Sequence, residues 1–474
     1  MSAAKSTSTP KRDYRIPASS GWAGLWKISA GIGIVGLGAA MAGYTQNAER
    51  FAHAYMFGFF TILTVALGAM FFVLIQHMTS AGWSVTTRRV AEFVLSGFPS
   101  LAVLFIPLLF VLSQLFPWLG HTEGHHAAGH ESATAAHGEH GHGESDNGMA
   151  RRRPETSESS ETTEHGHAAT AHPRGVRLTY EQIEHEHEHH QLHGKAAYLN
   201  KTFFLIRLVI YFLIWILIAM RLFGLSTLQD ETGDPNLTVR MQAMSFPATF
   251  LFGLTLTFAS FDWLMSLNPT WYSTIFGVQV FAGCAVTIFA LLILLSLLLR
   301  RAGLTGDAIS NEHLHDLGKL LFGFNAFWAY ISFSQFFLIW YAGIPEEAQF
   351  YHRRWADGPW KPVSIAIVVF HFIVPFWFLM SRNIKRRPGL LVVGALTLLV
   401  MHIVEIYWQV LPNFGRRGLS TEQVGPLQVH WMDVASLLGV GGIYFAVVFW
   451  RMTRHPLIPI RDPRLPRSLK FENA

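Results

Sequence analysis

One apolar run late in the chain carries three polar side chains that could move protons: His402, Glu405 and Gln409. Their spacing of i, i+3 and i+7 places them on one face of a helix. An ionisable group inside a membrane helix is a functional candidate, because burying it is costly. An imidazole beside a carboxylate can take up and release a proton near neutral pH. The pattern therefore predicts a proton path or a general base inside a membrane.

Five further polar residues lie within or at the ends of other apolar runs: His371, Asp262, Gln335, His53 and Asp433. His371 lies near the middle of its run, and the others lie toward the half of the membrane that the charge distribution places outside. Groups in that half could take up or release protons at the outer face. The competing interpretation is structural, because polar side chains near helix ends often bind neighbouring backbone or interfacial water.

The elements that must position these residues are apolar runs of about 20 residues, each long enough to cross roughly 30 Å of hydrocarbon as a helix. Of the 474 residues, 51% are hydrophobic and 14% are charged, whereas soluble proteins have about 25% charged residues. Ten spans are predicted, at residues 24–44, 52–77, 90–116, 199–222, 244–266, 272–299, 317–342, 362–381, 389–411 and 432–452. The fold class is therefore all-α, a polytopic membrane protein with ten transmembrane helices.

The chain divides into five predicted segments: a leader (1–23), three spans (24–117), a His-rich segment (118–198), seven spans (199–452) and a tail (453–474). The first span is too long for a signal-peptide core and lacks a convincing cleavage site, so we expect a retained helix rather than a cleaved signal. Of the 24 histidines, 15 lie in the His-rich segment. Because this segment has few large apolar residues, we expect disorder over most of its length. Its histidines are expected to bind metal adventitiously or to become positively charged in mild acid.

Lysine and arginine in the short loops predict the orientation. One side of the membrane receives 22 of them, including the pair Arg88 and Arg89, and the short loops opposite receive six. Both termini are therefore expected on the cytoplasmic side. The net charge of +5 belongs to this surface and indicates no nucleic-acid partner.

The single cysteine, Cys284, excludes a disulfide framework, a zinc ribbon, an iron–sulfur cluster on cysteine ligands and a CxxCH haem site. One b-type haem between His371 and His402 stays open, because both lie near mid-depth on consecutive spans. No span carries the His-x-x-x-Asp or His-x-x-x-His pairing of a zinc transporter, so no metal site is predicted. The sequence also lacks a phosphate-binding loop, which argues against an ATP-driven machine.

Two long runs resemble the NrfD/PsrC-like membrane subunits of alternative complex III: DWLMSLNPTWYSTIFG (262–277) and FSQFFLIWYAGIPEE (333–347). With FAHAY (51–55) and EIYW (405–408), they look most like the ActF type rather than its larger ActC relative. The resemblance covers all ten spans, but the His-rich segment is longer than is usual in that family. It implies two four-helix bundles plus two helices, in a bacterial inner (cytoplasmic) membrane.

The resemblance also implies a quinol:cytochrome c oxidoreductase whose haem c groups and iron–sulfur clusters lie in partner subunits. The expected partners are an ActC-like membrane subunit, an iron–sulfur subunit, cytochrome c subunits, lipids and a terminal oxidase. This chain would bind no redox cofactor and could contact quinone. His371, His402, Glu405 and Asp262 are then candidates for a proton path or a vestigial quinol pocket. Two alternatives remain, a purely structural membrane anchor and a secondary transporter of a cation or metal.

Overall fold

The computed structural model describes residues 13–119, 192–356, 358–415 and 425–472. Over these residues the chain is helical and contains no strand. Ten helices in this described part of the chain are long and apolar enough to cross a membrane, which confirms the predicted fold class. Most of the His-rich segment, and the disorder predicted for it, lies outside the described residues.

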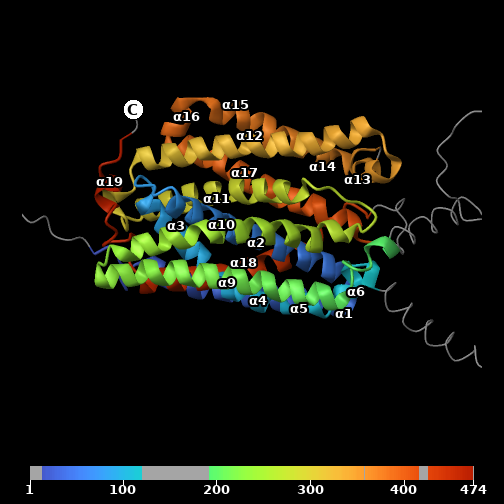
Figure 1. Ribbon diagram of the computed structural model, residues 1–474, viewed down its shortest axis with the longest axis horizontal. Coiled ribbons are helices and arrows are strands. Elements are labelled where there is room, and N and C mark those ends of the chain that lie inside the picture. Colours follow the sequence, from blue (N-terminus) through green and yellow to red (C-terminus); the bar gives the residue numbers. More distant parts are fainter. Residues whose placement is uncertain (1–12, 120–191, 357, 416–424, 473–474) are drawn as a thin grey trace, which may run out of the picture.

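The helices run nearly parallel along the long axis of the molecule (Figure 1). The α-helices are α1 (Leu25–Gln46), α2 (Ala48–Met78), α3 (Val85–Leu95), α4 (Phe98–Leu104), α5 (Ile106–Leu109), α6 (Leu112–Leu115), α9 (Lys201–Thr232), α10 (Asn236–Trp263), α11 (Phe276–Arg301), α12 (Asn311–Ala342), α13 (Pro345–Trp355), α14 (Lys361–Ala366), α15 (Val374–Met380), α16 (Arg382–Arg386), α17 (Pro388–Val410), α18 (Trp431–Arg454) and α19 (Leu465–Leu469). A π-helical segment, η4 (Ile367–Ile373), joins α14 to α15, and short 3-10 turns occur at Gly21–Gly24, Met265–Leu267, Gly306–Ala308 and Leu411–Asn413.

The helices form two four-helix bundles and one outlying pair. The first bundle contains α2, the broken span α3–α5, α9 and α10, and the second contains α11, α12, the span α14–η4–α15, and α17. Helices α2 and α11 pack against each other and join the bundles, while α1 lies along α18 at the side of the first bundle. Figure 1 shows α12, α14 and α15 on one side of the molecule and α1, α9 and α18 on the other.

Glycine allows α1 and α18 to approach closely, as small residues do between membrane helices. A Cβ atom on Gly36 would lie 2.6 Å from the backbone nitrogen of Gly439, and one on Gly442 would lie 2.4 Å from that of Gly33. The outward face of α1 is apolar and exposed, with Ile34 and Val35 among its residues. This face suits contact with lipid.

Both ends of the described chain lie at the same end of the bundles, since Leu457 donates its backbone N–H to Tyr14 O at 2.9 Å. An even number of spans requires this arrangement. The third span begins at Val85, five residues before the predicted start at residue 90. Arg88 and Arg89, which the charge distribution places in a loop, therefore lie inside a helix and are fully buried.

Candidate functional site

The site lies where η4 and α17 face each other inside the second bundle. His371 belongs to the π-helical η4, and His402 and Glu405 belong to α17. A π turn adds a residue to the helical turn and often occurs at functional sites. Glu405 follows His402 by three residues, so the two side chains share a face of α17 as predicted.

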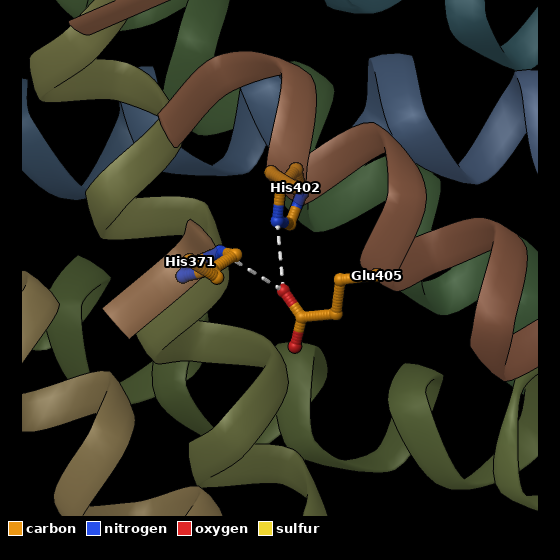
Figure 2. Close-up of side chains that lie close together, drawn as sticks. All are labelled: His371, His402 and Glu405. Atoms are coloured by element: carbon orange, nitrogen blue, oxygen red, sulfur yellow. Dashed lines mark hydrogen bonds and ion pairs between the residues drawn. The ribbon is translucent and has the colours of Figure 1, made fainter. Parts of the chain in front are cut away.

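Both imidazoles approach one oxygen of the carboxylate (Figure 2). His402 Nδ1 lies 3.1 Å from Glu405 Oε2, and His371 Nε2 lies 3.6 Å from the same oxygen. The side chains come from two separate spans and converge between their helices (Figure 2). We call these three residues, His371, His402 and Glu405, the triad.

The other carboxylate oxygen, Oε1, receives two N–H donors. Trp328 of α12 donates its indole Nε1–H to it at 2.8 Å, and Gln409 donates its amide at 3.4 Å. Trp328 also stacks on the His371 ring, with centroids 3.8 Å apart and planes inclined by 22°. Trp328 therefore holds both His371 and Glu405 in place.

The His402 ring is fixed from two more helices. Thr64 of α2 lies 2.9 Å from its Nε2. On α11, a Cβ atom at Gly283 would lie 2.8 Å from Cε1 of His402 and 3.5 Å from Oε2 of Glu405. The triad thus needs a glycine on α11 for space and a hydroxyl from the first bundle as a partner.

The triad is closed to solvent, with exposed fractions of 0% for His371, 1% for His402 and 2% for Glu405. Within the described residues, the ion pairs of Glu405 are those to the two histidines. A buried carboxylate is costly unless a positive charge or a proton neutralises it. The net charge of the triad therefore depends on how many protons its three side chains hold. A group of side chains that can hold different numbers of protons can take part in proton transfer.

The triad could also be considered as a metal site, because one donor atom from each residue lies within 4.8 Å of the others. Two imidazoles and a carboxylate suit first-row transition metals. Donors that lie about 2.0–2.2 Å from one zinc ion are about 3–3.6 Å from each other. The separations of 3.1 and 3.6 Å from the two imidazoles to Glu405 Oε2 (Figure 2) therefore suit a shared ion as well as a hydrogen-bonded carboxylate. A porphyrin between the two imidazoles, in contrast, would have to displace Glu405.

Asp262, a second candidate carboxylate, belongs to a separate cluster in the first bundle. Arg207 of α9 donates Nε–H and Nη2–H to its two oxygens, each at 2.8 Å. The Tyr211 hydroxyl donates to Oδ2 at 2.7 Å. The bidentate pair is buried and joins α9 to α10, which is a structural arrangement.

Asp433, His53 and Gln335 also lie outside the triad. Asp433 accepts a hydrogen bond from Arg50 and caps α18 by accepting the backbone N–H of His430 at 2.8 Å. The Nδ1 atom of His53 lies 2.9 Å from Glu49 O. Gln335 donates its amide to the Tyr351 hydroxyl at 3.0 Å. Of the eight polar candidates, the structure thus gathers His371, His402 and Glu405 into one site, with Gln409 beside them.

A second buried polar cluster lies at the end of the bundles where α19 packs against α3. Arg88 donates to Glu92 Oε1 at 2.8 Å and to Asp462 Oδ2 at 2.7 Å. Arg89 donates to Asp230 Oδ2 at 2.6 Å. We call Arg88, Arg89, Glu92, Asp230 and Asp462 the end cluster. It ties the C-terminal tail and α9 to α3.

Asp462 lies outside the spans, and the two arginines beside it determine its protonation. Burial raises the pKa of its carboxyl, but the charges of Arg88 and Arg464 outweigh burial and hold the pKa below its usual range. Asp462 also accepts the backbone N–H of Arg464 at 2.8 Å. The carboxylate therefore stays ionised while the tail is docked.

Trp328 and Thr64 are the triad partners that sequence reasoning misses. Tryptophan and threonine are common in membrane spans, and neither residue forms a motif with the triad residues. Each comes from a helix distant in sequence, so its role follows only from tertiary packing. Arg207, the partner of Asp262, carried a usable signal, because an arginine within an apolar run implies a buried acid.

No protein-family model matches the chain, and a comparison with curated proteins finds no significant match.

Proposed function

We propose that this chain is an integral membrane subunit of a respiratory quinol:cytochrome c oxidoreductase of the NrfD/PsrC-like, ActF type, and that it supplies a proton path. The membrane would be the bacterial cytoplasmic membrane, with both termini on the cytoplasmic side. Haem c and iron–sulfur clusters would belong to partner subunits, since the one cysteine, Cys284, is buried and cannot ligate a cluster alone. An ActC-like subunit and a terminal oxidase are the expected membrane partners.

The observation that carries the proposal is the buried triad. Two imidazoles meet one carboxylate oxygen in the membrane interior, at 3.1 and 3.6 Å. Groups of this kind, able to exchange protons among themselves at short range, form the relays of pumps and transporters. The triad is buried inside the second bundle, which favours a proton path over direct contact with quinone.

A structural anchor is the second candidate function, and a different observation favours it. Asp262 with Arg207, Asp433 with Arg50, and the end cluster all join helices through buried ion pairs. Such pairs fix the positions of the helices relative to one another. A rigid helical domain of this kind could anchor catalytic subunits to the membrane. The anchor and the proton path differ in what they require of Glu405.

Replacement of Glu405 by glutamine tests the proton path. The amide keeps the shape and can still accept the Trp328 N–H, but it cannot take up a proton. We expect assembly to be preserved and quinol-dependent cytochrome c reduction by the purified complex to fall by about tenfold or more, the scale of a lost acid–base group.

Glu312→Gln is the matched control, because Glu312 forms a partly exposed pair with Arg386 far from the triad. Full turnover of the Glu405→Gln complex would refute the proton path and leave the anchor. Purification of the native chain without haem-bearing partners would contradict both functions. Stoichiometric metal that disappears on His371→Ala would instead favour the transporter alternative.

A further inference from the structure

Thr64 connects the triad to the first bundle. It lies on α2 and is fully buried. Its Oγ1 lies 2.9 Å from His402 Nε2 and 2.7 Å from the backbone oxygen of Thr61. The hydroxyl therefore has two neighbours and a single hydrogen to donate.

The single hydrogen allows two arrangements with different numbers of protons. In the first, Thr64 donates to His402 Nε2, so the ring proton lies on Nδ1 and is donated to the Glu405 carboxylate. In the second, Thr64 donates to Thr61 O, and His402 donates Nε2–H to the Thr64 oxygen. The contact between Nδ1 and Oε2, at 3.1 Å, then needs a proton of its own, because two bare acceptors would repel each other.

The second arrangement holds one proton more than the first. That proton is taken from hydronium of the aqueous phase, which is left as water, and is bound at His402 Nε2 as the Thr64 hydroxyl turns away. The proton already on Nδ1 is then shared with Glu405 Oε2. No bond to carbon changes, and the charge of the triad rises by one. Loss of the proton reverses each step.

We propose that Thr64 is a hydroxyl switch that lets the triad alternate between these two proton loads. The inference deepens the proposed function and rests on it, since it specifies how the triad would accept and release a proton. Thr64 acts through His402 and is a positioning residue. Because Thr64 belongs to the first bundle and the triad to the second, the switch spans the contact between the two bundles.

The other titratable groups facing Glu405 are His371 from η4 and the Cys284 thiol from α11. Helices α2 and α12 contribute Thr64 and Trp328, which do not titrate near neutral pH. Neither His371 nitrogen has a hydrogen-bond partner among the described residues. The proton that is gained or lost is therefore assigned to the hydrogen bond between His402 and Glu405.

Thr64→Val is the test, because valine keeps the shape of threonine and removes the hydroxyl. In this variant Nε2 loses a hydrogen-bond donor in the first arrangement and an acceptor in the second. The second loss is the larger, because that Nε2–H belongs to a ring that shares the extra proton, and charge-assisted hydrogen bonds are the stronger ones. We expect infrared difference spectra of the purified complex to show the carboxylic acid band of Glu405 at a pH lower by about half a unit or more, the difference between losing a charge-assisted and a neutral hydrogen bond. Glu405→Gln assigns the band.

Two variants separate the switch from simple packing. Thr64→Ser should restore the wild-type midpoint, because it restores the hydroxyl. Thr61→Val is the matched control, since the Thr61 hydroxyl donates to Phe57 O at 2.8 Å and its backbone oxygen remains for Thr64. We expect it to leave the midpoint unchanged.

An unchanged midpoint in folded Thr64→Val, or a failure of Thr64→Ser to restore it, would overturn the switch. The proposed function is judged separately by the turnover of the Glu405→Gln complex. Reduced turnover in Glu405→Gln with a normal midpoint in Thr64→Val would keep the proton path and reject the switch.

Discussion

Glu405 and Asp262 are buried carboxylates in membrane spans, but their partners give them different roles. Asp262 pairs with the permanent cation of Arg207 at 2.8 Å. Glu405 faces two histidines, whose charge depends on bound protons. The partners of Glu405 can therefore exchange protons, whereas the partner of Asp262 cannot. At the residue scale, the partner rather than the carboxylate decides between structure and chemistry.

Asp262→Asn should therefore destabilise the protein. The variant leaves the Arg207 guanidinium buried without its counter-charge, and breaking such a pair costs about 3–5 kcal/mol. Thermal unfolding in detergent measures the loss. The fraction of the complex that still assembles with the Asp262→Asn chain should keep the proton-coupled turnover of the wild type.

The double variant Arg207→Leu and Asp262→Leu is the control, since it removes both charges and should recover much of the lost stability. If the Asp262→Asn variant had normal thermal stability and reduced turnover, the structural role would be wrong and Asp262 would belong to the proton path.

At the element scale, two local departures from a regular straight helix shape the molecule. The π turn of η4 carries His371, which stacks on Trp328 of α12 and approaches Glu405 of α17. The glycines of α1 let this otherwise peripheral helix lie against α18 at backbone contact. In both places the backbone, rather than a polar pair, brings the helices to the required distance.

Gly36→Ala should separate α1 from α18. Its added methyl group would lie 2.6 Å from Gly439 N and 2.8 Å from Ala435 O, and neither backbone atom can move aside easily. Overpacking of this kind costs about 1–3 kcal/mol. The measurement is the thermal unfolding of the purified protein in detergent.

Gly38→Ala is the matched control on the same helix, because a Cβ atom there meets nothing within 4 Å. It should be neutral or slightly stabilising, since alanine is the better helix former. Equal unfolding temperatures for the two variants would show that α1 and α18 do not pack at this seam.

At the scale of the whole molecule, polar contacts join segments that are distant in sequence. They do so at two places, one in the interior and one at the end of the bundles. Thr64 and His402 connect the first bundle to the second in the interior. The end cluster connects α3 to the tail through Arg88 and Asp462, and to α9 through Arg89 and Asp230. Both sites need the complete set of helices in place.

Docking of the tail should depend on pH through Asp462. Because the pKa of this carboxyl is lowered in the folded protein, its stabilising contribution is present above the unfolded value of about 3.9. The contribution is lost as the pH falls through the lower folded value. We expect limited proteolysis of residues 455–472, followed by mass spectrometry, to accelerate only below about pH 4.

Asp462→Asn should expose the same cleavage sites already at neutral pH, because it leaves Arg88 without this partner. Asp13→Asn, at an exposed position near the same end, is the control and should leave the cleavage profile unchanged. Slow cleavage of the Asp462→Asn tail at neutral pH would show that the end cluster does not hold it.

The amino-acid pattern alone predicts the ten spans, because apolar runs of the right length have few alternatives to crossing a bilayer as helices. It also placed His402 and Glu405 on one helix face, since a spacing of three residues is a local property of the helix. His371 was a candidate only by its depth.

Which of the candidate residues meet one another follows from the tertiary structure alone. It brought His371, Trp328 and Thr64 to α17 from three other spans, and it paired Asp262 with Arg207 and Asp433 with Arg50. These contacts depend on helix rotation, on a π turn and on close packing at Gly283. Such features arise from the fit of many side chains at once, and no local pattern of residues encodes them.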